Sequence, residues 1–249
     1  MFFSIAFAAY LWLSLSLVPI SAASVGVPDL TSRQLGGPYQ GVVSSTLLGY
    51  WPFLGTYYDL SPNARGPALV NGTNVALNPL GYVEIRQPGF LSIPAVDIRT
   101  ISFAITFTLR LPSAPTARQI LLSNWKSNEW QYLMTVDAAG TMSFVLRRNI
   151  NTNGSNGAQD LVAVTTAATV PIGTFFNVIY TYNTSQRTLS VYINGILSAS
   201  AVVPSQFTDL TLHNATQTYV QFGSKADDIP VTGTLNADLS QLLFLQLAF

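Results

Sequence analysis

Apolar and polar residues alternate along most of this chain, and that pattern predicts β-strands. From Ile101 to Leu111 every second residue is large and apolar, with Ser, Ala, Thr and Arg in between. A strand gathers such residues on one face, whereas a helix would scatter them around its circumference. Segments 130–136, 141–148, 219–222 and 235–247 are also predicted strands, and no long segment has the period and end signals of a helix. Short strands separated by Gly, Pro and Asn predict an all-β fold, a two-sheet antiparallel β-sandwich or jelly roll.

Two short segments between predicted strands have the composition of tight turns. Asn194-Gly195 separates the alternating run that ends at Ile193 from the one that begins at Ile196. This dipeptide is the strongest short-range hairpin signal, because both central residues of a type I′ turn need a positive φ. Segment 137–140 ends in a glycine that can adopt the left-handed conformation. We therefore expect hairpins at both places.

The first twenty residues are apolar and carry no charged side chain. Ser21-Ala22-Ala23 then places small residues at the −3 and −1 positions of a cleavage site, which predicts a signal peptide over 1–23. The alternative is an uncleaved anchor, since about twenty apolar residues can just span a bilayer. We expect an N-terminal arm or leader strand over 24–45, a folded domain over 46–249, a secreted protein, and no membrane span after cleavage.

Four Asn-X-Ser/Thr sequons support secretion, and each is expected in a loop or turn where a glycan could be tolerated. Their acceptor residues are Asn71, Asn153, Asn183 and Asn214. Chance is the alternative explanation in a chain rich in Asn, Ser and Thr.

Composition excludes several classes of function. The chain contains no cysteine, which rules out disulfides, zinc–thiolate clusters and thiol catalysis. Its formal net charge is zero and no segment is strongly basic, so nucleic acid is disfavoured as a partner. The length suits one all-β domain with a core large enough to fold without disulfides.

Five motifs occur in an order that resembles the laminin-G-like, concanavalin-A-like lectin/glucanase family of jelly-roll domains. They are Tyr50-Trp51-Pro52-Phe53 with the turn Asp59-Leu60-Ser61-Pro62-Asn63, then Ile101-Ser102-Phe103-Ala104-Ile105, Gly173-Thr174-Phe175-Phe176-Asn177-Val178, Leu189-Ser190-Val191-Tyr192-Ile193-Asn194-Gly195, and Gly233-Thr234-Leu235-Asn236-Ala237-Asp238-Leu239. The departures from the family pattern include Pro62, which replaces a glycine, and Phe175, which replaces a tryptophan. The resemblance implies a domain that holds ligands and that only in some branches cuts them.

The inventory of acidic residues argues against catalysis. Glycosidases on this fold place two Glu on one strand, because a pair of carboxylates must flank the scissile bond. This chain has only Glu84 and Glu129, in separate segments, and the pair Asp227-Asp228 has no acid partner along a strand. The one histidine, His213, has no Gly-X-Ser-X-Gly elbow to serve. We expect no enzyme; a divergent glycan-processing activity is kept only by analogy with the fold.

Calcium is the cofactor that the resemblance implies, since members of this clan hold it with Asp and Asn oxygens. Asp59 and Asn63 match the family's polar turn, and Asn236 or Asp238 matches the acid of its closing strand. The alternative for Asp59 is an Asx-turn, in which the carboxylate accepts backbone N–H groups.

Exposed aromatic rings are the feature expected of a sugar site, because they stack on the apolar faces of sugars. Trp125 is the candidate, flanked by Asn124, Lys126 and Glu129. Other aromatics are assigned to the core: Trp51, Phe53, Phe176, Tyr180 and Tyr182. The predicted function is a secreted, non-catalytic recognition module for a glycan or glycoprotein. The alternative is a structural or adhesive component of a matrix, wall or coat that binds proteins. The oligomeric state is left open.

Overall fold

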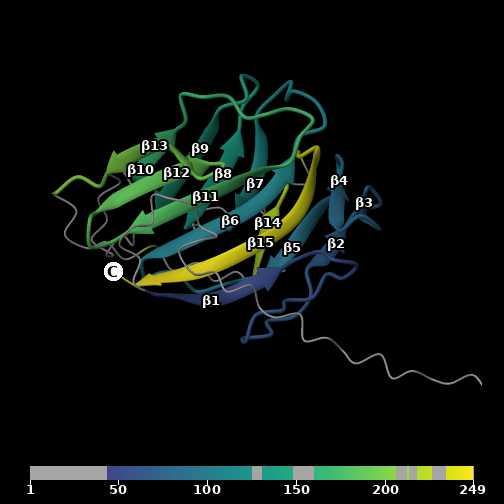
Figure 1. Ribbon diagram of the computed structural model, residues 1–249, viewed down its shortest axis with the longest axis horizontal. Helices are drawn as coiled ribbons and strands as arrows, with labels where there is room; N and C mark the ends of the chain where they lie inside the picture. Colours follow the sequence, from purple (N-terminus) through teal and green to yellow (C-terminus); the bar gives the residue numbers. More distant parts are fainter. Residues whose placement is uncertain are drawn as a thin grey trace, which may run out of the picture.

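The computed structural model describes residues 44–124, 131–147, 160–205, 212, 218–225 and 234–248. Regular secondary structure within these ranges consists of fifteen strands, arranged in two antiparallel sheets that pack face to face (Figure 1). The prediction of an all-β, two-sheet sandwich is confirmed. Among the described residues no helix is long and apolar enough to span a membrane.

The first sheet contains the strands nearest both ends of the described chain. Its order is β13 (Ile196–Val202), β12 (Thr188–Ile193), β11 (Phe176–Asn183), β6 (Phe103–Arg110), β15 (Ala237–Ala248), β4 (Tyr82–Ile85) and β3 (Val75–Asn78), with β1 (Ser44–Trp51) also paired to β15. Strand β15 is long enough to pair with β6 on one side and with both β4 and β1 on the other.

The second sheet covers one face of the first. Its order is β10 (Asp160–Thr165), β9 (Met142–Arg147), β8 (Tyr132–Val136), β7 (Gln119–Ser123), β14 (Tyr219–Phe222), β5 (Phe90–Pro94) and β2 (Leu69–Asn71). Most of its strands follow one another as neighbours, and β14 enters between β7 and β5 from a distant part of the sequence.

Alternation along the strands builds the core between the sheets. On β6 the residues Phe103, Ile105, Phe107 and Leu109 are fully buried, as their two-residue spacing predicts. Phe107 meets Phe222 of the second sheet edge to face, with ring centroids 5.4 Å apart. The five aromatics assigned to the core from the sequence are all buried: Trp51, Phe53, Phe176, Tyr180 and Tyr182.

Both expected hairpin turns are present. Asn194 has a φ of 51° and Gly195 a φ of 77°, which is the pair of positive values that a type I′ turn needs. Gly140, with a φ of 79°, closes the turn between β8 and β9. The side chain of Asn194 accepts a hydrogen bond from the backbone N–H of Asn177 at 2.9 Å, so the turn is tied back onto β11.

The expected domain boundary falls inside a strand. Ser44 and Ser45 pair with Ala248 and Leu247, so β1 begins two residues before the predicted start of the domain at residue 46. Pairing with the long strand β15 extends β1 beyond its apolar residues, which a hydrophobic pattern cannot reveal. The predicted signal peptide and most of the arm lie outside the described residues.

The outer face of the first sheet has two unlike ends. Towards the end of β15, Ala104, Ile179, Leu245 and Leu247 form a small second apolar cluster. Towards the start of β15 the outward residues of β4, β6 and β15 are mainly charged or polar. That polar end is the part of the fold that carries candidate chemistry.

Candidate functional site

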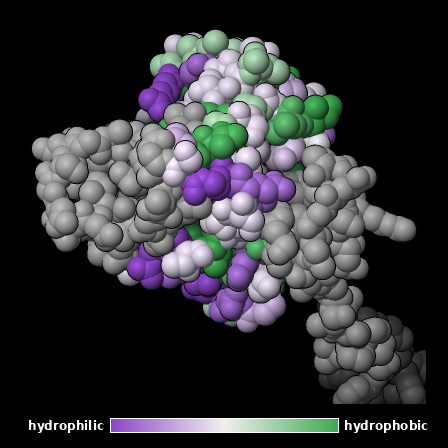
Figure 2. All heavy atoms as spheres, turned by 90° about the vertical axis from the view of Figure 1, so that its left-hand side faces the viewer, coloured by the Kyte–Doolittle hydropathy of each residue, from purple (hydrophilic) through white to green (hydrophobic). Residues whose placement is uncertain are grey.

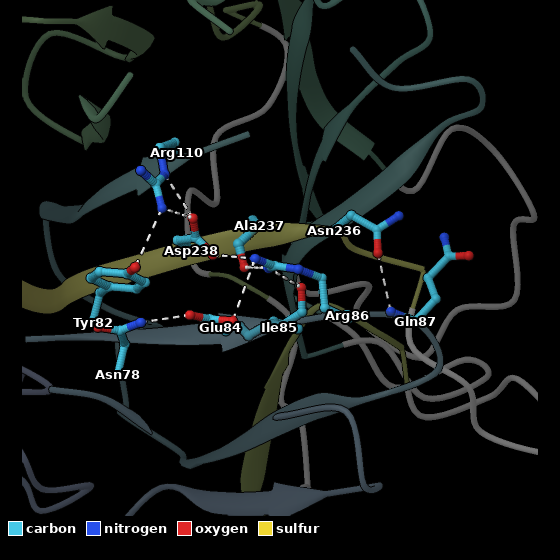
Figure 3. Close-up of polar contacts among 10 residues, drawn as sticks. All are labelled: Asn78, Tyr82, Glu84, Ile85, Arg86, Gln87, Arg110, Asn236, Ala237 and Asp238. Carbon is cyan, nitrogen blue, oxygen red and sulfur yellow. Dashed lines mark hydrogen bonds and ion pairs between the residues drawn. The ribbon is translucent and has the colours of Figure 1, made fainter. Parts of the chain in front are cut away.

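A polar cluster lies on the outer face of the first sheet where β15 begins (Figure 3). Asp238 pairs in register with Glu84 of β4 and with Arg110 of β6, so the three side chains share one face of the sheet. Its neighbours Ala237 and Leu239 point the other way and are buried in the core. Strand alternation therefore positions the carboxylate between two strands that arrive from distant parts of the sequence.

Two guanidinium groups hold the Asp238 carboxylate. Arg86 Nη2 lies 2.6 Å from Oδ1, and Arg110 donates to Oδ2 from Nε at 2.7 Å and from Nη2 at 2.6 Å. The Asp238 side chain is fully buried, whereas those of Arg86 and Arg110 are 36% and 31% exposed. The hydrogen bond from Arg110 raises the pKa of its guanidinium above the ordinary value. Both carboxylate oxygens are thus committed within the protein.

A second carboxylate brings the charge of the cluster to balance. Glu84 Oε2 lies 3.8 Å from Arg86 Nη2, and its Oε1 accepts a hydrogen bond from Asn78 Nδ2 at 2.6 Å. Arg86 also donates through Nη1 to the backbone oxygens of Ile85 and Ala237. Two cations and two anions therefore face each other on this surface.

Two aromatic rings lie beside Arg110. Its guanidinium carbon is 5.0 Å from the ring centroid of Phe175 and 5.4 Å from that of Tyr82, within the range of cation–π contacts. The two rings meet each other at 62° with centroids 5.5 Å apart. Tyr82 is nearly buried, but Phe175 is 40% exposed. Part of an apolar residue is therefore exposed to solvent next to a cation.

A row of amides and hydroxyls adjoins these rings. Asn177, Thr108 and Gln241 are opposite one another on β11, β6 and β15. Thr108 Oγ1 accepts a hydrogen bond from Gln241 Nε2 at 3.0 Å and a longer one from Asn177 Nδ2 at 3.4 Å. We call the half-exposed group of Phe175, Arg110, Asn177, Thr108 and Gln241 the outer shelf.

The second proposed metal residue pair lies in the turn after β1. Asp59 is buried and accepts four hydrogen bonds of 2.8–2.9 Å. Its Oδ1 accepts from the backbone N–H groups of Tyr50 and Ser61. Its Oδ2 accepts from the Ser61 hydroxyl and from the backbone N–H of Arg65. Asn63 donates through Nδ2 to the backbone oxygens of Leu47 and Leu48. This is the Asx-turn that was the alternative to a metal site.

The four residues proposed for calcium do not come together. Tyr50, which binds Asp59, pairs with Leu243, five positions along β15 from Asp238, which separates the two sites by roughly 15 Å. Asn236 Oδ1 accepts the backbone N–H of Gln87 at 3.2 Å. No cluster of three or more acidic or histidine side chains suited to a metal occurs among the described residues. Calcium needs six to eight oxygen ligands, so an ion at either place would need ligands beyond these residues, and calcium binding stays a prediction.

Of the proposed sugar-binding residues, only Asn124 lies within the described ranges. It is buried, and its Oδ1 accepts the backbone N–H groups of Gln131 and Tyr132 at 2.8 and 2.9 Å. Its Nδ2 donates to Gln131 Oε1 at 2.8 Å. Asn124 therefore fastens together the two ends of segment 125–130 rather than presenting its amide to a ligand. Trp125, Lys126 and Glu129 lie outside the described residues.

Two of the four sequons fall on strands, contrary to the expectation of loops or turns. Asn71 is the last residue of β2, and its Nδ2 donates to Ser92 Oγ at 2.8 Å. Asn183 is the last residue of β11 and is buried, with its Oδ1 accepting the backbone N–H of Gln186. Asn153 and Asn214 lie outside the described residues.

Comparison with known proteins decides the family. The family model of the concanavalin A-like lectin/glucanases superfamily, in its laminin-G form, matches residues 87–241, more than half of the chain. The chain belongs to this superfamily. A search of curated protein sequences finds no match.

Solved structures similar to this superfamily member include several sugar-bound domains. Domain 4 of an extracellular arabinanase from Geobacillus stearothermophilus, in complex with arabinotriose, is 15% identical with a TM-score of 0.56, covering 82% of this chain and 94% of that one. The CBM40 of a Ruminococcus gnavus sialidase, bound to α2,3 sialyllactose, is 15% identical with a TM-score of 0.50, covering 71% and 90%. Botulinum neurotoxin type C is 16% identical with a TM-score of 0.56; 80% of this chain matches 47% of that one.

These similarities support the fold assignment, but a binding site must be argued from the residues of this chain. At such identities, likeness shows the fold alone, and this chain spans about half the length of the neurotoxin chains. Within the concanavalin A-like sandwich, sequence reasoning missed Arg110 and Tyr82. Arg110 is the one charged residue among the outward positions of its strand, and that break in a row of Ala and Thr was the available signal.

Proposed function

We propose that this chain is a secreted, non-catalytic recognition module that binds a glycan or glycoprotein. Its superfamily and the carbohydrate-binding domains among its structural neighbours support a sugar ligand. The observation that carries the non-catalytic part is the state of Asp238, which is fully buried with both oxygens held by guanidinium groups. Hydrolysis of a glycosidic bond needs two carboxylates that reach the substrate, and Asp238 cannot serve as one of them.

The segment 125–130 is proposed as one place where a sugar could bind. Trp125 would supply the stacking face, with Lys126 and Glu129 as polar neighbours. The three hydrogen bonds of Asn124 support this indirectly, because they fix the two ends of the segment against β7 and β8. Asn124 is then a positioning residue.

A glycan-array screen of the chain from Ser24 onwards, with calcium and with chelator, tests the proposal. We expect binding to a restricted set of glycans and no release of sugar from those glycans during prolonged incubation. Trp125→Ala measured in the same screen, with its melting temperature, examines segment 125–130. Steady hydrolysis of a bound glycan would show that the protein is an enzyme and contradict the non-catalytic role. If no glycan binds, the proposed function is wrong.

Secretion is proposed from the leader, with cleavage after Ala23. Expression in a eukaryotic secretory host should release a protein whose N-terminal sequence begins at Ser24. Recovery of the intact Met1 form in membranes would replace this with an anchored protein. Mass analysis of the secreted form would also show which of the four sequons carry glycans.

One observation favours a protein-binding role as a second candidate. Strand β13 is an edge of the first sheet, has no charged residue, and exposes Ile196, Leu197 and Val202. Exposed edge strands without charges can pair with another chain. Figure 2 shows the side of the molecule where β13 and β10 lie. Among the residues coloured there, apolar ones are separated by polar ones. If β13 mediates self-assembly, Val202→Lys should lower the mass measured by light scattering; a monomeric wild type would exclude self-assembly through β13.

A further inference from the structure

We propose that the outer shelf is a binding site for an uncharged sugar. The inference rests on the proposed function and deepens it by naming the surface and the class of ligand. It differs from the Trp125 hypothesis in place, because the shelf lies on the outer face of the first sheet, whereas β7 and β8, which flank segment 125–130, belong to the second.

Three polar groups on the shelf have no hydrogen-bond partner among the described residues, although the side chains that carry them are held in place. The Nδ2 group of Asn177 is held by Thr106 and Thr108, and the Nε2 group of Gln241 by Thr108. The threonines thus fix which end of each amide is bound internally, leaving Asn177 Oδ1 and Gln241 Oε1 without a donor among the described residues. Arg110 binds Asp238 and Tyr82 through Nε and Nη2, and its Nη1 is likewise unused there. Two acceptors and one donor match the hydroxyl groups of a sugar.

Phe175 supplies the apolar component. It is 40% exposed even though Tyr82 and Arg110 pack against it. Aromatic faces stack on the apolar faces of sugars while neighbouring polar groups bind the hydroxyls. Adjacent outward rows of a sheet are about 7 Å apart and neighbouring strands about 4.8 Å apart. The shelf therefore spans a surface of the size of one or two sugar rings.

The charge balance selects an uncharged ligand. Arg86 and Arg110 would attract an anionic sugar if they were free, but Asp238 and Glu84 lie against them and neutralise both. Arg110 Nη1 could still donate to a carboxylate on the ligand, but without an unbalanced positive charge the shelf would gain little electrostatic attraction to offset the desolvation of that carboxylate. The sialylated ligands of the similar structures are therefore not expected to be preferred at this site.

Paired glycans and paired variants test the inference. The probes are an array in which each neutral oligosaccharide stands beside its sialylated form, including lactose with α2,3-sialyllactose, together with arabinotriose. We expect signals on the neutral members. Phe175→Leu, which keeps apolar bulk over Arg110, should weaken binding about tenfold. Gln241→Ala should weaken it about fivefold. Tyr219→Ala is the control, because Tyr219 is an equally exposed aromatic on the second sheet, and we expect no change.

The outcomes separate this inference from the proposed function. A wild type that binds glycans but is indifferent to Phe175→Leu and Gln241→Ala overturns the shelf and leaves glycan recognition standing, as does loss of binding in Trp125→Ala alone. A preference for the sialylated members overturns the uncharged ligand. A wild type that binds nothing on the array overturns both. If Phe175→Leu melts well below the wild type, Gln241→Ala carries the test, since its side chain lies outside the core.

Discussion

Two buried aspartates in this domain are stabilised in opposite ways. Asp59 lies in the turn after β1 and accepts four hydrogen bonds, three from backbone N–H groups and one from a hydroxyl, all within the turn and the neighbouring strand. Asp238 lies on β15 and is held by the side chains of Arg86 and Arg110, which come from two other strands. One carboxylate organises a local turn with neutral donors, and the other joins three strands by charge.

The difference matters because the two environments respond differently to the loss of charge. Backbone N–H groups around Asp59 are neutral, so an uncharged acceptor can replace part of what the carboxylate does. The guanidinium groups around Asp238 are charged, so removing the carboxylate leaves like charges facing each other. Substitutions that separate shape from charge should therefore distinguish the two sites.

The largest effect is expected for Asp238→Ala. Removing one partner of a buried ion pair typically costs about 3–5 kcal/mol, and the partial exposure of Arg86 and Arg110 places this case near the lower end, at about 3 kcal/mol. Asp238→Asn should cost nearly as much, because its amide nitrogen would turn a donor towards a guanidinium group. Chemical denaturation of the purified variants measures both values.

The control for this prediction is an ion pair on the surface. Asp97 forms a salt bridge of 2.8 Å with Arg99, and its side chain is 63% exposed. Asp97→Ala should change stability by less than about 1 kcal/mol, as exposed pairs generally do. If Asp238→Ala cost no more than Asp97→Ala, the charge-based description of the cluster would be wrong.

The second largest effect is expected for Asp59→Ala, at about 2 kcal/mol, because three backbone N–H groups lose their acceptor and that of Tyr50 is buried. Asp59→Asn should recover at least half of that loss, since its Oδ1 can still accept from Tyr50 and Ser61. The ratio of the Asn to the Ala effect, measured by the same denaturation series, is the sharpest form of the comparison. Equal losses for Asn and Ala at Asp59 would show that charge decides there as well.

The sequence predicted the fold of both regions, left two possible roles for Asp59 and did not indicate the role of Asp238. Strand alternation is a local signal, so β6, β12 and the Asn194-Gly195 turn were placed correctly from their own residues. The Asx-turn of Asp59 was one of two local options, and the structure decides between them. The partners of Asp238 are more than one hundred positions away in sequence, and only the register of β4, β15 and β6 brings them together.

Contacts between residues that are distant in sequence also explain why the candidate sites were hard to predict. Asn124 stands beside a tryptophan in sequence, which suggested a ligand contact, but its hydrogen bonds go to Gln131 and Tyr132, seven and eight positions along the chain. The outer shelf draws its residues from β6, the start of β11 and β15, so no contiguous motif announces it. Phe175 could be recognised only as a substitution for a family tryptophan.

Asn124→Ala extends the comparison to a buried polar group without charge. Its three hydrogen bonds join neutral groups, so we expect a loss of about 1–1.5 kcal/mol, smaller than at either aspartate. Denaturation again gives the value. The variant should also bind glycans more weakly if segment 125–130 is the sugar site, and should bind normally if the outer shelf is. A loss of stability larger than that of Asp238→Ala would contradict the proposed order, in which Asp238 with its charged partners contributes most, Asp59 with its neutral donors less, and the neutral Asn124 least.

The smallest effect is expected from calcium. Each oxygen of Asp59 already accepts two donors and each oxygen of Asp238 faces a guanidinium group, so an ion would have to displace these partners. We expect the melting midpoint in millimolar calcium and in chelator to agree within about 1 °C. A ligand present at a hundred times its Kd would stabilise the native state by about 2.7 kcal/mol and raise the midpoint by several degrees. Such a rise would show that calcium binds, and its loss in Asp59→Ala but not in Asp238→Ala would assign the ion to the turn. Because Asp59 binds Tyr50 of β1, calcium would then also stabilise the pairing of β1 with β15. The contribution of Asp59 to stability would depend on calcium, whereas that of Asp238 would not.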